Sequence, residues 1–227
     1  MFLGGYLSDM QGSKATFLEA RCREWNVPYL RMDYTGHGQS GGKFEEGSIG
    51  RWAKDVLSVL DQITEGPQIL VGSSMGGWIM LLTARARRER ICGLLGIASA
   101  PDFTEHLIWD QLTETQRQTI LQDGYYVLPQ ENCHDPDAMD FPITRTLIED
   151  GRKHLLLDRP IPLTCPVRLL HGMQDTDVPW HISTRLAGQL ESTRVTVTLQ
   201  KTGDHRMSTP ESLALLEREL LALLAEV

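Results

Sequence analysis

One serine in this 227-residue sequence is surrounded by the residues that nucleophilic catalysis requires. Residues 72–76 read Gly-Ser-Ser-Met-Gly, so Ser74 stands at the centre of a G-x-S-x-G pattern. Such a serine sits on a sharp turn between a strand and a helix, and the flanking glycines let the two elements pass closely. A β-rich stretch, 68–71, precedes the pattern, and residues with helical spacing follow it from Met75. The sequence therefore predicts that Ser74 is a nucleophile at the start of a helix and that its neighbour Ser73 is structural.

A serine hydroxyl is a weak nucleophile at neutral pH, so it needs a general base and a carboxylate that orients this base. When the serine comes first in the chain, the base is expected in the loop after a late strand. Of the seven histidines, only His205 lies in the loop after the last expected strand. His171 stands at the end of the preceding strand, where we expect it to brace the next loop by hydrogen bonding. His205 is therefore the predicted base.

The carboxylate is expected in the loop that follows the strand at 167–170. Asp175 and Asp177 both lie in this loop. We favour Asp175, because Asp177 precedes Val178-Pro179 and fits a helix cap. Asp204, next to the predicted base, is a weaker third candidate that would instead shape the loop of the base.

Acyl transfer also needs donors for the oxyanion that develops in the transition state. One is expected to be the backbone N–H of Met75, directly after the serine. We assign the other to the backbone N–H of Tyr6, in the turn after the first strand, where two preceding glycines let the backbone approach. A plain turn ahead of the next helix is the alternative for this segment.

Aromatic side chains are candidates for the wall of a substrate pocket. The predicted substrate-binding residues are Trp78, Trp109 and Trp180, with further aromatics in the same region at Tyr125, Tyr126 and Phe141. Ordinary core packing is the alternative for all of them, and for Trp78 the two interpretations are equally open.

A second glycine pattern, G-x-G-x-x-G at 36–41, resembles a dinucleotide-binding fingerprint. That fingerprint requires a helix that opens at its third glycine, but here residues 42–47 intervene before the next helix. Neither a P-loop nor an H-E-x-x-H metal motif occurs, and the four cysteines form no C-x-x-C pair. We therefore expect no cofactor and no metal.

The elements that would position these residues alternate along the chain. The expected strands are 27–33, 68–72, 91–98, 167–171 and 194–200, after a first strand that begins at Met1. The expected helices are 13–25, 48–64, 75–88, 179–190 and 209–224, with Ser48 and Thr209 as N-caps. Such alternation predicts an α/β fold in which helices cover both faces of a mostly parallel sheet.

Residues 101–162 interrupt this alternation. They contain no convincing strand and fit two or three helices, which predicts a helical cap inserted late in the sheet. Residues 1–100 and 163–227 would then form the two parts of the core.

Composition excludes some classes of function. The chain carries 22 basic and 30 acidic residues, a net charge of −8, so it would repel a phosphate backbone and we expect no nucleic-acid partner. No apolar run approaches the ~20 residues that span a bilayer. The start lacks a basic lead, so we expect a cytoplasmic protein, or one of the mitochondrial matrix if a presequence has been removed.

Together these motifs resemble the α/β-hydrolase superfamily over nearly the whole chain. The turn at 33–40 is similar to the family's D-x-x-G-x-G-x-S turn, and residues 5–8, 66–78, 168–181 and 204–207 resemble the mitochondrial palmitoyl-protein thioesterase (mycophenolic acid acyl-glucuronide esterase) subgroup. The resemblance implies Ser74, Asp175 and His205 as a catalytic triad, with S-acyl or carboxylic esters as substrates. It also implies two leading strands before the one at Met1, so we expect either that these strands are lost or that the given start omits them.

We therefore predict a serine hydrolase that cleaves carboxylic esters or thioesters through an acyl-enzyme. Its substrate would be a small molecule or an acylated protein, and it would act as a monomer or weak homodimer. A haloperoxidase or a carbon–carbon bond hydrolase of the same fold shares such a triad, and a ligand-binding protein can keep the fold without turnover. Substrate screens separate the enzymes, and labelling by a fluorophosphonate separates an enzyme from a binding protein.

Overall fold

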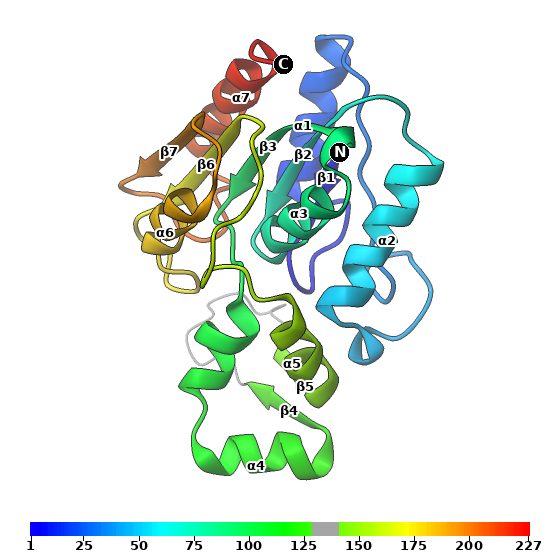
Figure 1. Cartoon of the computed structure of the whole chain (residues 1–227), viewed down its shortest axis with the longest axis vertical. Coiled ribbons are helices and arrows are strands. Elements are labelled where there is room, and N and C mark those ends of the chain that lie inside the picture. Colours follow the sequence, from blue (N-terminus) through cyan, green and yellow to red (C-terminus); the bar gives the residue numbers. More distant parts are fainter. Residues whose placement is uncertain (129–140) are drawn as a thin grey trace.

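A parallel sheet lies at the centre of the computed structural model, which describes residues 1–128 and 141–227 (Figure 1). Its strand order is β1-β2-β3-β6-β7, and every pairing is parallel. The strands are β1 (Phe2–Leu3), β2 (Gln68–Ser73), β3 (Ile91–Ile97), β6 (Val167–Gly172) and β7 (Val195–Gln200). The predicted mostly parallel sheet is confirmed.

The strand expected at 27–33 is largely absent. Within this segment only Arg31 forms a bridge, to Phe2, and the Phe2 N–H donates to the carbonyl of Leu30. The reason is that the segment borders β1, the two-residue strand at one edge of the sheet, which offers little backbone to pair with.

Helices cover both faces of the sheet, as the alternation predicted (Figure 1). They are α1 (Ser13–Glu24) and α7 (Pro210–Leu224) on one face, and α2 (Ile49–Gln62), α3 (Met75–Ala86) and α6 (His181–Gln189) toward the other. The Ser48 hydroxyl accepts the Arg51 N–H at the start of α2, and Thr209 caps α7 in the same way. No helix in the described ranges is both long and apolar enough to cross a bilayer.

The apolar stripe of α2 shows how the helices dock. Trp52, Val56 and Leu60 are buried as their spacing predicted, but Ile63 is 68% exposed. The helix ends at Gln62, and Ile63, whose N–H still donates to the carbonyl of Val59, is its C-cap. The stripe therefore stops one residue earlier than expected.

The segment between β3 and β6 leaves the sheet and forms a separate group of elements (Figure 1). Its helical parts are a π-helical turn (Thr104–Ile108), a 3-10 turn (Trp109–Gln111), α4 (Glu114–Asp123), α5 (Arg145–Gly151) and a 3-10 turn (Arg152–His154). Further 3-10 turns, Phe44–Glu46 and Arg88–Arg90, belong to the rest of the chain. We refer to residues 101–162 as the cap, as the sequence proposed.

The expectation that the cap contains no strand is wrong. An antiparallel pair, β4 (Tyr125–Leu128) and β5 (Phe141–Thr144), lies between α4 and α5. Side-chain exposure alternates along β4, as expected for a strand, but over only four residues. Tyr125 and Val127 are 57% and 38% exposed, whereas the residues between and after them are half-buried. So short a repeat does not stand out from a helical pattern.

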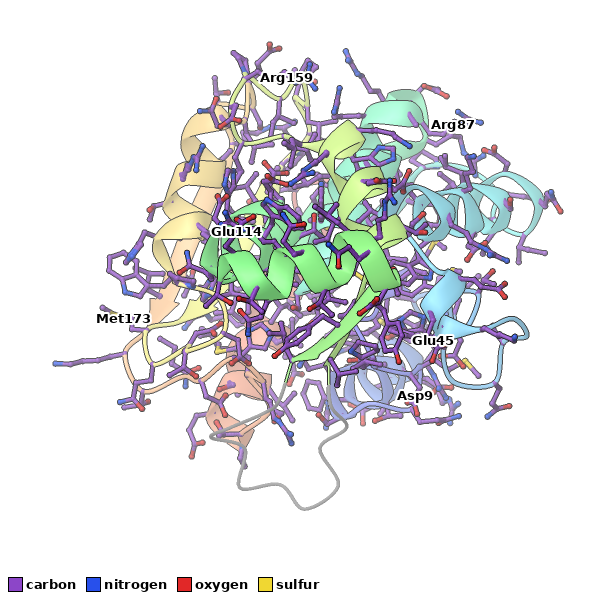
Figure 2. All side chains as sticks on the ribbon, turned by 90° about the horizontal axis from the view of Figure 1, so that it is seen from below. Asp9, Glu45, Arg87, Glu114, Arg159 and Met173 are labelled. Carbon is purple, nitrogen blue, oxygen red and sulfur yellow. The ribbon has the colours of Figure 1, made fainter. Side chains whose placement is uncertain are left out.

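Two sets of hydrogen bonds hold the cap in place, a buried set within the cap and a partly buried bond from the cap to the core. The carboxylate of Asp102 accepts the backbone N–H groups of Leu156 and Leu157 at 2.7–3.0 Å. The carboxylate of Asp150 accepts the Gly50 N–H at the start of α2, at 2.7 Å. Seen from below, α4, which begins at Glu114, crosses in front of the molecule between Met173 on one side and Glu45 on the other (Figure 2). The cap is therefore fixed across one end of the core.

Candidate active site

Ser74 occupies a strained turn between β2 and α3. Its backbone has φ 54° and ψ −121°, a conformation that is unfavourable for a residue with a side chain. The turn is held from β3, because the Ser74 N–H donates to Ile97 and the Ser74 carbonyl accepts the N–H of Ala100. Although Ser74 is the N-cap residue of α3, its hydroxyl makes no cap hydrogen bond. The hydroxyl thus remains available to another side chain.

Both glycines of the G-x-S-x-G pattern lie too close to neighbouring backbone atoms to carry a side chain. A Cβ on Gly72 would lie 2.4 Å from the carbonyl oxygen of Gly76. A Cβ on Gly76 would lie 2.1 Å from the carbonyl oxygen of Leu3 at the end of β1. No side chain fits at such distances, so the pattern permits strand, helix and the neighbouring strand to meet at Ser74.

Three side chains from distant parts of the chain form a hydrogen-bonded row. The Nε2 atom of His205 lies 3.1 Å from Oγ of Ser74, and its Nδ1 atom lies 2.7 Å from Oδ2 of Asp175. His205 is partly exposed, with 23% of its side chain accessible, whereas the Asp175 side chain is fully buried. This is the arrangement in which an imidazole can take a proton from a hydroxyl while a carboxylate orients it.

Each oxygen of the Asp175 carboxylate has two hydrogen-bond partners. Oδ1 accepts the backbone N–H groups of Asp177 and Val178, at 2.9 and 2.7 Å. Oδ2 faces the imidazoles of His205 and His171, the latter at 3.1 Å. Burial by itself would raise the pKa of Asp175, but the hydrogen bonds from His171 and His205, the charge of His205 and the Val178 N–H together hold this pKa well below its usual range. Asp175 is therefore ionised at neutral pH.

His171 braces the acid loop, as its position at the end of β6 suggested. Its Nε2 atom also lies 2.9 Å from the carbonyl oxygen of Val178, and its Nδ1 atom lies 2.7 Å from Oγ of Ser183 on α6. The sequence did not point to Ser183, since a serine in the first turn of a helix carries no signal of such a contact.

The loops of acid and base lie directly against each other. The Gln174 N–H donates to the carbonyl of Gly203 at 2.8 Å, and a Cβ on Gly172 would lie 2.3 Å from the carbonyl carbon of Gly203. Asp204 accepts the Met207 N–H, which agrees with its expected part in shaping the loop of the base. Close backbone packing between the two loops thus sets the distance between carboxylate and imidazole.

The helix cap expected at Asp177 is not formed. The N-cap of α6 is Trp180, which makes no side-chain cap bond, because the chain enters the helix at His181 rather than at Pro179. The carboxylate of Asp177 is exposed instead, and its backbone N–H points to Asp175.

Both predicted oxyanion donors belong to segments that meet at the Ser74 turn. Met75 is the first residue of α3, where backbone N–H groups have no partner within the helix. The turn that carries Tyr6 touches Ser74 through Gly5, and the Tyr34 hydroxyl holds it by donating to the Gly4 carbonyl at 3.1 Å.

Known proteins resemble this chain in sequence and in structure. Residues 18–153 match the family described as serine aminopeptidase, S33. The mitochondrial palmitoyl-protein thioesterase ABHD10 of Rattus norvegicus is 45% identical over 216 residues, which cover 95% of this chain and 71% of that protein. The solved structure of mouse α/β-hydrolase domain-containing protein 10 is 43% identical, with a TM-score of 0.90 over 99% of this chain and 88% of that one. The chain belongs to the ABHD10 family of α/β-hydrolases.

A further solved protein, from Agrobacterium vitis S4, is 38% identical, with a TM-score of 0.92 over 98% of this chain and 86% of that one. The α/β-hydrolase fold predicted from the motifs is thereby confirmed, and this member of the ABHD10 family is a hydrolase.

The aromatic residues predicted to bind substrate have different surroundings. Trp78 is fully buried, and its indole N–H donates to the carbonyl of His154 in the cap at 3.1 Å, which favours the core interpretation. Trp109 is half-buried, with the guanidinium groups of Arg117 and Arg152 over its ring. Trp180 is half-buried beside the acid loop. The cap aromatics Tyr125 and Tyr126 are exposed and half-buried, and the side chain of Phe141 is outside the described residues.

Tyr6 has a second role in this ABHD10-family chain through its ring. The ring packs edge-on against Phe44, Trp52 and Phe103, and its hydroxyl donates to the carbonyl of Pro142 in the cap. Burial raises the pKa of this hydroxyl far above its usual range, so it stays protonated. The residue whose N–H is a candidate oxyanion donor therefore also joins core and cap.

Among the described residues, one group has the spacing of a metal site: Asp175, Asp177 and His205, with ligand atoms within 4.8 Å of one another. The oxygens of Asp175 already accept hydrogen bonds from two backbone N–H groups and face two imidazoles. This donor set suits proton transfer better than metal coordination.

The carboxylate of Asp33, three residues before the G-x-G-x-x-G pattern, occupies the space inside this turn. The carboxylate of Asp33 accepts the backbone N–H groups of Gln39 and Met10, at 2.9 and 2.7 Å. It lies so close to Gly38 that a Cβ there would be 2.2 Å from one of its oxygens. A carboxylate in this position would repel a phosphate, which supports the expectation that this turn binds no nucleotide.

Proposed function

We propose that this ABHD10-family hydrolase cleaves carboxylic esters and thioesters with Ser74 as nucleophile, His205 as general base and Asp175 as orienting acid. The observation that carries the proposal is the hydrogen-bonded row from Ser74 Oγ through His205 to Asp175, with 3.1 and 2.7 Å between neighbouring atoms. The strained turn supports it, because it keeps the hydroxyl out of a cap bond with its own helix.

In the acylation step, Ser74 Oγ attacks the acyl carbonyl carbon while Nε2 of His205 takes the hydroxyl proton. Asp175 holds the Nδ1–H of the resulting imidazolium and stabilises its charge. The backbone N–H groups of Met75 and Tyr6 would bind the oxyanion, and one such donor typically contributes about 2.7–4 kcal/mol to lowering the barrier. His205 then protonates the departing thiolate or alkoxide, which leaves Ser74 acylated.

In the deacylation step, water attacks the acyl carbon and His205 takes a proton from it. Collapse of the second tetrahedral intermediate returns this proton to Ser74 and releases the carboxylic acid. The cycle consumes water alone and requires no cofactor.

The names of the relatives support acylated proteins as one substrate class, since the rat protein is called a palmitoyl-protein thioesterase. We expect small esters to be cleaved as well, because a serine triad acts on either bond. Trp109 in the cap and Trp180 beside the acid loop are the half-buried aromatics proposed to contact the acyl chain. Rates across a chain-length series of p-nitrophenyl esters and acyl thioesters measure this preference.

The decisive experiment compares two neighbouring serines. Ser74→Ala should lower the rate of p-nitrophenyl ester hydrolysis by at least about 10³-fold and abolish labelling by a fluorophosphonate. Ser73→Ala, at the last residue of β2 and directly before Ser74, should retain both. Turnover by the Ser74→Ala protein, purified free of other esterases, would disprove the proposal.

The names of the relatives, rather than the site, bear on the compartment. The mammalian relatives are named as mitochondrial, which supports the matrix as an alternative to the cytoplasm that the sequence favoured. Subcellular fractionation of the source cells distinguishes the two.

A further inference from the structure

His171 is a second histidine on the carboxylate of Asp175, and the proposed proton transfers do not use it. Its side chain is completely buried at the end of β6. Its Nε2 atom lies 3.1 Å from Oδ2 of Asp175 and 2.9 Å from the carbonyl oxygen of Val178, and its Nδ1 atom lies 2.7 Å from Oγ of Ser183. All of its polar atoms are therefore engaged.

The two partners of Nε2 require a hydrogen on that ring nitrogen. An ionised carboxylate and a carbonyl only accept hydrogen bonds, so Nε2 of His171 must donate. The Ser183 hydroxyl can donate, and Nδ1 is within its reach. We assign His171 as the neutral Nε2–H tautomer, with Ser183 as the residue that maintains it.

As a consequence, Oδ2 of Asp175 accepts hydrogen bonds from two imidazoles. His205 approaches at 2.7 Å and His171 at 3.1 Å. Each donor withdraws charge from the oxygen that they share, so the bond from His171 competes with the bond from His205. The carboxylate also cannot turn without breaking bonds to both rings and to the backbone of the acid loop.

We propose that His171 is a positioning residue that acts through Asp175: its Nε2–H holds the carboxylate in place and limits the negative charge that the carboxylate offers to His205. This inference rests on the proposed function, since it concerns the orienting acid of that site. His171 then has an electrostatic role toward His205 in addition to its structural role in the loop that carries Asp175.

The other elements around His171 bring no charge to it. Leu199 of β7 lies opposite it in the register, Ala98 follows β3, and α6 contributes Ser183. Besides Asp175 and His205 themselves, the charged side chains of the two loops are all exposed: Asp177, Lys201, Asp204 and Arg206. A change of the pH profile on substitution of His171 would therefore report on Asp175 and His205.

Two substitutions separate the electrostatic from the structural part. His171→Leu removes the donor at similar volume, whereas in His171→Gln the side-chain amide can still donate to Asp175. For His171→Leu we expect the acid limb of the kcat/KM profile to move to higher pH by about half to one unit, because Asp175 then stabilises the imidazolium of His205 more strongly. For His171→Gln the limb should stay within about 0.2 unit. A folded Leu variant with an unmoved limb, or equal shifts in both variants, would overturn the proposal.

A measurement on the unsubstituted protein decides the question if His171→Leu does not fold. Nitrogen-15 NMR of labelled histidines should show His171 as the Nε2–H tautomer, and its N–H signal should move as His205 is titrated, because the two share Oδ2. An Nδ1–H tautomer, or a signal that ignores this titration, would contradict it. The NMR experiment needs no turnover, so failure of the proposed function, seen as an active Ser74→Ala protein, is distinguishable from failure of this inference.

Discussion

Gly5 lies against Ser74, so that a Cβ on this glycine would be 3.3 Å from the Cβ of the serine and 3.5 Å from the carbonyl oxygen of Ser73. The turn after β1 therefore touches the turn that carries the proposed nucleophile. This contact brings the segment that carries Tyr6 to Ser74, in agreement with the proposal that the Tyr6 N–H is an oxyanion donor.

The first prediction is that Gly5→Ala lowers kcat by about tenfold with little change in stability. The added methyl group must displace Ser74 by a few tenths of an ångström, and reaction rates fall steeply when a nucleophile is misplaced. Steady-state kinetics with a p-nitrophenyl ester measure the effect. Gly4→Ala is the matched control, because its Cβ would meet only Ser8, at 3.8 Å, and it should leave kcat unchanged.

The second prediction concerns the pH dependence of stability at Asp175. The pKa of this group is lower in the folded protein than in the unfolded chain, so its ionised form stabilises the fold at pH values above the ordinary carboxyl pKa, and this contribution disappears as the pH falls toward the folded-state pKa. Asp175→Asn should thus be less stable than the unsubstituted protein at pH 7, and the difference should shrink at pH 3. Urea unfolding at both pH values measures it; a difference that is constant with pH would contradict the assignment.

The residues of the site were easier to predict than the contacts that support them. Ser74 and His205 are 131 residues apart, yet each stands in a local pattern, one after a β-rich run and the other in the last post-strand loop. Parallel strands bring such loops to one edge of the sheet, so chain order alone suggested their meeting. The structure brings these side chains within hydrogen-bond distance.

The supporting contacts leave no comparable trace in the sequence. Asp102 accepts N–H groups from residues more than 50 positions away, with a positive φ of 62° that its sequence does not suggest. The Nδ1 atom of His171 lies 2.7 Å from Oγ of Ser183, on another element. Contacts of this kind follow from how elements pack together, which periodicity does not describe.

The third prediction concerns the attachment of the cap. Asp150→Ala should lower the free energy of unfolding by about 1 kcal/mol, because the Gly50 N–H at the start of α2 loses its carboxylate partner. Asp158→Ala is the control: this aspartate is 66% exposed and pairs at the surface with Arg185, so its loss should cost under about 0.5 kcal/mol. Denaturant titrations of both variants test the difference, and equal losses would show that Asp150 is an ordinary surface acid.

The last prediction contrasts two glycines. Gly76→Ala should destabilise the protein strongly and abolish activity, because its Cβ would lie 2.1 Å from the carbonyl oxygen of Leu3 and 2.5 Å from that of Gly4, and backbone atoms cannot turn aside as a side chain can. Gly188→Ala, near the end of α6, meets nothing within 4 Å. It should raise the free energy of unfolding by about 0.5–1 kcal/mol, since alanine loses less conformational freedom in a helix. Thermal melts and esterase assays of both variants distinguish a glycine that is needed for close approach from one that is only tolerated. A stable, active Gly76→Ala protein would show that β1 does not pass this close to α3.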